Sequence, residues 1–187
     1  MFDDGRSKSV IFVAHCIFNQ NAISDGTASY PGHIKEILEV LHSSDAGIIQ
    51  MPCPELQCLG LDRGNVLGGS TPVVQENTRI RKVFGHNTHS ESIKHLAENI
   101  VNQILEYQKH GFEIKGVIGI NRSPSCGVNS TSKDNQEVEG KGVFMEALHK
   151  KLQSYDRHVK MVGIKAFEID QAVHTVKKLL SSVEKNT

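Results

Sequence analysis

The chain has no tryptophan, few aromatic residues and no excess of charge of either sign. Aromatic residues make up 5% of its 187 residues, and 21 basic side chains balance 21 acidic ones. Proteins that bind single-stranded nucleic acid stack the bases on aromatic side chains, and nucleic-acid-binding domains generally carry a basic excess. The composition therefore shows no strong nucleic-acid signal.

Long hydrophobic runs are also missing. No stretch approaches the roughly 20 apolar residues that a membrane-spanning helix needs. The chain begins with Met-Phe-Asp-Asp, without the basic start and apolar run of a secretory signal peptide. We therefore expect a cytoplasmic protein with no membrane segment. Disulfides are rare in that compartment, so the four cysteines are more typical of metal ligands or of chemistry.

Short apolar runs alternate with segments of helical periodicity. The runs, which suit strands of a parallel sheet buried on both faces, cover residues 9–14, 47–51, 115–120 and 159–164. The predicted helices cover about 31–42, 88–110, 143–152 and 169–183. This alternation predicts one compact α/β domain over residues 1–187, Rossmann-like or flavodoxin-like. We expect about four parallel strands with helices on both faces.

Several residues indicate where these helices begin and end. Pro31 suits the first position of the first helix, and Thr88 with Glu91 forms a capping-box pattern at the start of the longest one. Gly111 is typical of the end of that helix. The last helix carries apolar residues as far as Val183.

Two stretches predict neither a helix nor a strand. Residues 59–87 are rich in glycine and aperiodic, and residues 127–140 are polar. Loops of this length in a compact domain are usually functional or disordered. The first stretch also holds basic residues that either bind a phosphate or carboxylate or form a solvated surface, namely Arg63, Arg79, Arg81 and Lys82.

Three of the four cysteines occupy the same topological position. Cys16, Cys53 and Cys126 each lie shortly after a predicted strand. Ligands of open parallel sheets bind at the carboxyl ends of the strands, so we expect these thiols to converge. A single cysteine is more often a small buried hydrophobic residue, but three in equivalent places favour a shared site.

Three thiolates in one place suit a soft metal. Zinc would add a histidine or a water as fourth ligand, and an iron–sulfur cluster would keep one iron open. Cys58, five residues after Cys53, is a further ligand, a resolving thiol or packing. A cluster closed by four thiolates normally transfers electrons only.

Polar residues flank two of these cysteines. Glu55 lies two positions after Cys53 and is a candidate acid or base, or else a carboxylate at a helix N-terminus. Ser123 and Ser125 precede Cys126, and Ser125 could cap the following turn. The carboxylate and the hydroxyl groups beside the cysteines make the shared site a candidate catalytic site.

These residues form motifs that resemble the thiouracil desulfurase family, whose members are also called desulfidases. The motifs are Cys16 with Asp25-Gly26, Cys53-Pro54-Glu55, Arg122-Ser123-Pro124-Ser125-Cys126-Gly127 and Gly142-Val143-Phe144. The resemblance covers about residues 10–165, and Ser-Pro-Ser-Cys-Gly is its most specific element. It implies a 4Fe-4S cluster on Cys16, Cys53 and Cys126, with Glu55 and Ser123 as catalytic residues.

The function that the resemblance implies is a non-redox, iron–sulfur-dependent desulfidase. Such an enzyme releases sulfide from a small thiocarbonyl substrate, such as a thiouracil or a thiolated nucleoside. Ala22 and Ile23-Ser24 depart from the family pattern, which has a second cysteine followed by Arg-Tyr. We expect these changes to leave the ligands in place and to alter the substrate pocket. The alternatives are a sulfur or iron–sulfur carrier and a metal-free thiol enzyme with Cys126 as nucleophile.

Overall fold

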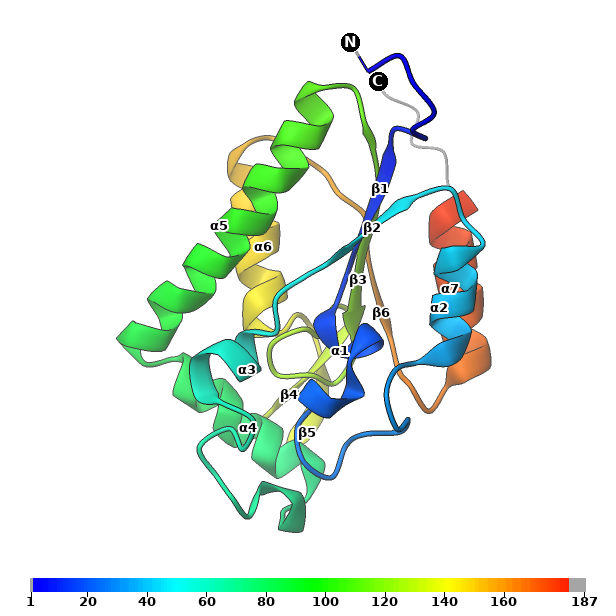
Figure 1. Cartoon of the computed structure of the whole chain (residues 1–187). Coiled ribbons are helices and arrows are strands. Elements are labelled where there is room, and N and C mark those ends of the chain that lie inside the picture. Colours follow the sequence, from blue (N-terminus) through cyan, green and yellow to red (C-terminus); the bar gives the residue numbers. More distant parts are fainter. Residues whose placement is uncertain (1, 182–187) are drawn as a thin grey trace.

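A computed structural model of the protein describes residues 2–181 and has a four-stranded parallel sheet at its centre (Figure 1). The strand order is β2-β1-β3-β6. The strands are β1 (Ser9–Val13), β2 (Gly47–Gln50), β3 (Glu113–Ile120) and β6 (Met161–Ile164). All three neighbouring pairs are parallel, which confirms the predicted α/β fold with four parallel strands.

The position of a strand in the sheet decides how deeply its apolar run is buried. Ile11, Phe12 and Val13 of β1 are fully buried because β2 and β3 pair on either side of this strand. The prediction that β2 is buried on both faces is wrong. It is an edge strand, and Ile48 is 40% exposed.

Helices cover both faces of the sheet, as predicted. Figure 1 shows α5 (Asn87–Lys109) and α6 (Val143–Ser154) on one side of it. On the other side lie α2 (Lys35–His42) and α7 (Ile169–Ser181). Each helix turns an apolar stripe toward the strands, and the buried residues join into one hydrophobic core.

The first residues of two helices differ from the positions that the sequence predicted. Helix α2 begins at Lys35 rather than near Pro31, and α5 has His86 at its N-cap with no side-chain capping bond. The expected capping box at Thr88 is therefore absent, since Thr88 already lies inside the helix. Gly111 does follow the end of α5, with a φ of 77° that favours glycine. Val183 lies outside the described residues.

Both stretches without predicted structure contain regular elements. The first holds α4 (Val73–Phe84) and, at its edge, the end of α3 (Pro54–Leu59). The second forms an antiparallel hairpin of β4 (Ser130–Lys133) and β5 (Gln136–Glu139). The sequence of α4 shows no apolar helical periodicity because several of its buried residues are polar, namely Glu76, Asn77 and Thr78.

The carboxyl ends of the strands gather the elements that carry the sequence motifs. Helix α1 (His15–Phe18) follows β1 directly, and α3 follows β2. Figure 1 shows α1, α3, α4 and the hairpin at this end of the sheet. The connection from β2 to β3 passes over β1, so the strand order reverses between β1 and β3, where parallel sheets bind their ligands.

Within residues 2–181, no helix is both long and apolar enough to cross a bilayer.

Candidate functional site

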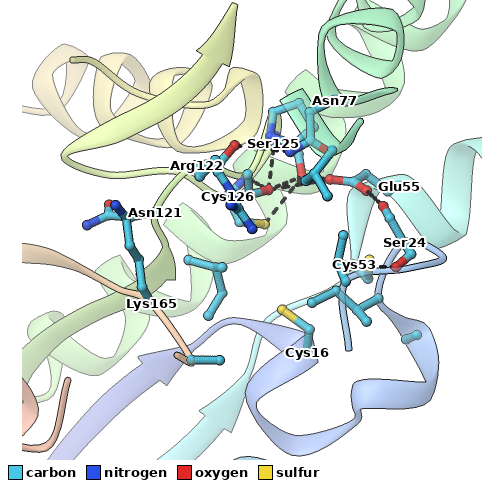
Figure 2. A pocket seen from close by; sticks show the side chains of 18 of the residues that line it. Cys16, Ser24, Cys53, Glu55, Asn77, Asn121, Arg122, Ser125, Cys126 and Lys165 are labelled. Atoms are coloured by element: carbon cyan, nitrogen blue, oxygen red, sulfur yellow. Dashed lines mark hydrogen bonds between the residues drawn. The ribbon is translucent and has the colours of Figure 1, made fainter. Parts of the chain in front are cut away.

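A pocket of about 100 Å³ lies at the carboxyl ends of the strands. Its lining includes all five residues that the motifs single out, namely Cys16, Cys53, Glu55, Ser123 and Cys126. Figure 2 shows the three cysteines, which come from segments far apart in the sequence, around the same space. The structure therefore brings the five residues together, and their roles as ligands or catalysts stay predictions.

Each cysteine is placed by a different element. Cys16 lies in α1, and Cys126 lies in the loop that returns from β3. Cys53 is the N-cap of α3, where its Sγ accepts a hydrogen bond from Leu56 N at 3.4 Å. Pro54 follows at the first helical position, so Glu55 lies in the first turn of α3 and is also the N-terminal acid that the sequence allowed.

The three thiols affect each other's protonation. Burial raises the pKa of Cys16, Cys53 and Cys126, and the nearby Glu55 carboxylate adds to this rise. The thiols of Cys16 and Cys53 also raise the pKa of Cys126. Without a cation between them these groups therefore stay neutral thiols, and a neutral buried thiol is a poor nucleophile.

The donor set fits an iron–sulfur cluster. Three thiols line one pocket, and a bound cation would favour their thiolate forms, which are the forms that ligate iron. Within the described part of the chain, no group of three His, Cys, Asp or Glu side chains is placed so that it could hold a single metal ion. A cluster differs from a single ion in that it binds each thiolate through a different iron.

Cys58 lies apart from this set. It is in α3, is partly buried against the hydrophobic core and does not belong to the described lining of the pocket. Burial raises the pKa of its thiol, and a hydrogen bond with Ser92 of α5 partly offsets that rise. Of the roles that the sequence left open for Cys58, packing between α3 and α5 agrees best with this position.

Glu55 is buried, at 6% exposure, and is held by four donors. Its Oε2 accepts hydrogen bonds from Ser24 Oγ at 3.0 Å and from Arg63 Nε at 3.2 Å. Its Oε1 accepts them from Ser125 Oγ at 2.6 Å and from Ser123 Oγ at 3.4 Å. A buried carboxylate with this many donors has a fixed orientation.

Arg63 is the residue of this site that the sequence reasoning largely missed. It is 3% exposed, and besides Glu55 it binds the carbonyl oxygens of Ala22, Gly60 and Leu61. The sequence left open whether the basic run meets a carboxylate or forms a solvated surface. Arg63 does meet a carboxylate, that of Glu55. Its bond to Ala22 O also joins the loop before α4 to the segment after α1.

The other basic residues of that run have different partners. Arg79 pairs with Glu76 at 2.7 Å and donates to the carbonyl oxygen of Arg63 at the same distance. Arg81 Nη1 donates to Thr131 Oγ1 at 3.0 Å and to Lys141 O at 3.2 Å. These bonds tie α4 to the loops that carry the site, so the run is not a plain solvated surface.

The two serines of the Ser-Pro-Ser-Cys segment have distinct contacts. Ser123 Oγ accepts hydrogen bonds from Cys126 N at 3.0 Å and from Ser125 N at 3.3 Å, so Ser123 caps the turn that presents Cys126. Ser125 makes the shorter bond to Glu55 and is 1% exposed. The cap expected of Ser125 is therefore supplied by Ser123.

Helix α4 supports the backbone of the same segment. Asn77 lines the pocket, and its Nδ2 donates to Arg122 O at 3.3 Å and to Ser132 Oγ at 3.2 Å. Arg122 has a positive φ of 70°, which is uncommon for a residue with a side chain. A buried amide in a polar segment gives no periodic signal, so nothing in the sequence alone indicated Asn77.

The rim of the pocket carries cations and an exposed aromatic ring. Lys165 and Phe167 follow β6 and line the pocket together with Arg122. The Arg122 guanidinium lies 5.3 Å from the centre of the Phe167 ring, and Lys165 Nζ lies 5.7 Å from it. Phe167 is 59% exposed, so much of its ring surface is accessible beside the pocket.

Comparisons with known proteins agree with this site. The family model for 2-thiouracil desulfurase matches residues 11–157. An uncharacterised protein of Methanocaldococcus jannaschii is 27% identical over 180 residues, which cover 96% of this chain and 97% of that protein. No solved structure matches the chain significantly. Since the family model spans most of the chain, the protein belongs to the 2-thiouracil desulfurase family.

Proposed function

We propose that the protein is a non-redox desulfidase that removes sulfur, as sulfide, from a small thiocarbonyl compound and depends on a 4Fe-4S cluster. The observation that carries this proposal is the single pocket in which three thiols face a buried carboxylate and two hydroxyl groups. Membership of a desulfurase family supports the same reaction class.

Cys16, Cys53 and Cys126 are the residues that would hold the cluster. When bound, a cluster with three thiolate ligands supplies an iron with an open position, which acts as a Lewis acid toward the thiocarbonyl sulfur. The raised pKa of each thiol means that binding must displace its proton, so loading is favoured at higher pH.

The remaining residues act on water and substrate. Glu55 would take a proton from the water that attacks the thiocarbonyl carbon and later return it to the departing sulfide. Arg63 and Ser24 hold Oε2 of this carboxylate, which leaves Oε1 toward the Ser-Pro-Ser-Cys segment. Ser123 would orient the substrate, and its hydroxyl is fixed by the two backbone amides that it caps.

The family and the pocket support a small thiolated substrate with a planar ring, such as a thiouracil or a thiolated nucleoside. The exposed ring of Phe167 could stack upon such a substrate. We place this small-molecule chemistry in the cytoplasm, where the cysteines stay reduced.

A test needs protein reconstituted with iron and sulfide under anaerobic conditions and a panel of thiolated pyrimidines and nucleosides. The wild type should release sulfide with the matching oxygen compound as co-product, whereas Glu55→Gln should keep its iron and lose activity by about 10²–10⁴-fold. A carrier of sulfur or clusters would not need Glu55. An iron-loaded wild type that releases no sulfide from any of these substrates would contradict the proposal and favour a carrier.

A further inference from the structure

The two carboxylate oxygens of Glu55 have chemically different partners. Arg63 Nε contacts Oε2, and a guanidinium does not give up its protons in proteins. Hydroxyl groups contact Oε1, and a hydroxyl can accept one proton while it donates another. A proton on Oε2 would also face the positive charge of Arg63. Oε2 is therefore an anchor, and Oε1 is the oxygen that can exchange a proton.

The two hydroxyls near Oε1 are not equivalent either. Ser125 Oγ lies 2.6 Å from Oε1, whereas Ser123 Oγ lies 3.4 Å away and already accepts from two backbone amides. The serine oxygens lie 3.3 Å apart, so Ser123 also reaches the carboxylate through Ser125. Ser125 Oγ lies 3.6 Å from Cys126 Sγ and lines the pocket (Figure 2). A continuous path of polar contacts from Cys126 to Glu55 therefore runs through Ser125.

We infer that Ser125 is the proton relay between the pocket and Glu55, an inference that rests on the proposed desulfidase function. As a water molecule in the pocket attacks, one of its O–H bonds breaks and the proton passes to Ser125 Oγ, directly or through Ser123 Oγ. In the same step the proton of Ser125 passes to Glu55 Oε1. The electron pair of the broken bond stays on the attacking oxygen. Ser125 is neutral before and after the step, and the reverse transfer returns the proton to the departing sulfide.

Ser24 provides a matched control for this inference. It is buried like Ser125, and its hydroxyl group also donates a hydrogen bond to Glu55, but to Oε2, the oxygen that Arg63 anchors. If hydroxyls only held the carboxylate in place, removing either one would cost a single hydrogen bond to a charged group, and the two losses would be similar. The relay predicts that the two serines differ.

The first measurement is sulfide release by reconstituted Ser125→Ala, Ser125→Thr and Ser24→Ala. We expect kcat to fall about 100-fold or more in Ser125→Ala, which is the scale of positioned proton transfer. It should fall only about tenfold in Ser24→Ala, the lower end of the effect of one lost hydrogen bond to a charged group. Ser125→Thr keeps a hydroxyl and should restore most of the rate, with iron content near wild type in all three. Equal losses in the two alanine variants would overturn the relay.

A second measurement does not depend on turnover. A hydroxyl proton bonded to a buried carboxylate exchanges slowly with water, so its proton resonance should be visible in NMR spectra of the full chain. The resonance should be lost in Ser125→Ala, shifted in Glu55→Gln and retained in Ser24→Ala. If the wild type has no desulfidase activity, the proposed function fails, and this resonance still tests the link. Its absence from the wild type would overturn the relay.

Discussion

At the scale of single residues, the site depends on a carboxylate that has been taken out of water. Glu55 and Arg63 form an ion pair whose side chains are 8% and 2% exposed. Burying two charges costs several kcal/mol, and their attraction together with further hydrogen bonds offsets that cost. Arg63 meets this condition with three backbone carbonyls, and Glu55 meets it with three hydroxyls. Neither residue can be removed alone without leaving its partner uncompensated.

Replacement of Arg63 tests this dependence. We expect Arg63→Met to lower the free energy of unfolding by about 3–5 kcal/mol, the usual cost of breaking a buried pair. Denaturation by urea measures the change. In Arg63→Met combined with Glu55→Gln the loss should be smaller, because no buried charge is left unpaired. Additive losses in the double variant would mean that the two side chains do not interact.

The effect of replacing a cysteine should depend on whether its side chain lines the pocket. We expect serine at Cys16, Cys53 or Cys126 to remove most of the bound iron, because a hydroxyl oxygen competes poorly with thiolate for cluster iron. Cys58→Ser is the matched control, since Cys58 packs outside the pocket and its replacement should leave the iron content near wild type. Iron and sulfide assays after anaerobic reconstitution give the answer. An equal loss of iron in Cys58→Ser would indicate a site of four thiolates.

At the scale of elements, the loop after β3 turns back against its own strand. Ile120 N donates to the carbonyl oxygen of Cys126 at 2.9 Å, and Gly142 N donates to Gly127 O at 3.0 Å. Gly119 allows this approach because a Cβ atom there would clash with the carbonyl oxygen of Cys126. The position of the third cysteine therefore depends on a missing side chain in the strand before it.

A methyl group at Gly119 should disturb both the core and the site. We expect Gly119→Ala to destabilise the protein by about 1–3 kcal/mol, as overpacking does, and to reduce iron binding because Cys126 is displaced. Gly32→Ala is the control, since no atom lies within 4 Å of a Cβ added at Gly32. Its free energy of unfolding should change by less than about 0.5 kcal/mol. Iron content near wild type in Gly119→Ala would mean that the loop adapts without moving the ligand.

At the scale of the whole molecule, the site is a product of topology. Three parallel strands run in the same direction and end beside one another, so the residues that follow them share one edge of the sheet. Helices α3 and α4 and the β4–β5 hairpin close that edge (Figure 1). Cys53 and Cys126 are buried and Cys16 is partly buried as a result, and that burial links the protonation of the three thiols to the stability of the fold.

Iron-free protein should therefore lose stability at high pH. The pKa of Cys16, Cys53 and Cys126 lies above the ordinary value of 9.0 in the folded state, so the folded chain keeps protons that the unfolded chain releases. Stability from these groups is full below about pH 8 and falls as the pH rises through 9, by up to about 1.4 kcal/mol per unit for each thiol. Urea unfolding at several pH values measures this slope. A variant with serine at all three positions should show a shallower decline, and an unchanged slope would contradict the burial.

The sequence alone was enough to predict the four strands of the parallel sheet, four of the helices and the meeting of the three cysteines. Short apolar runs and apolar stripes depend on local periodicity, and the carboxyl ends of neighbouring parallel strands must share an edge. Glu55 and the Ser-Pro-Ser-Cys segment were also visible, because they adjoin the cysteines along the chain. These features need no knowledge of how distant segments pack.

The contacts that hold these residues in place became evident only from the three-dimensional structure. Helix α4 buries polar side chains against the hairpin, so its pattern is not amphipathic, and the burial of Arg63 follows from contacts with Ala22 and Glu55. The division of work between Ser123 and Ser125 depends on differences of less than 1 Å between alternative hydrogen bonds. Polar contacts across long separations leave no period in the sequence, because their strength depends on distance and direction in space and not on spacing along the chain.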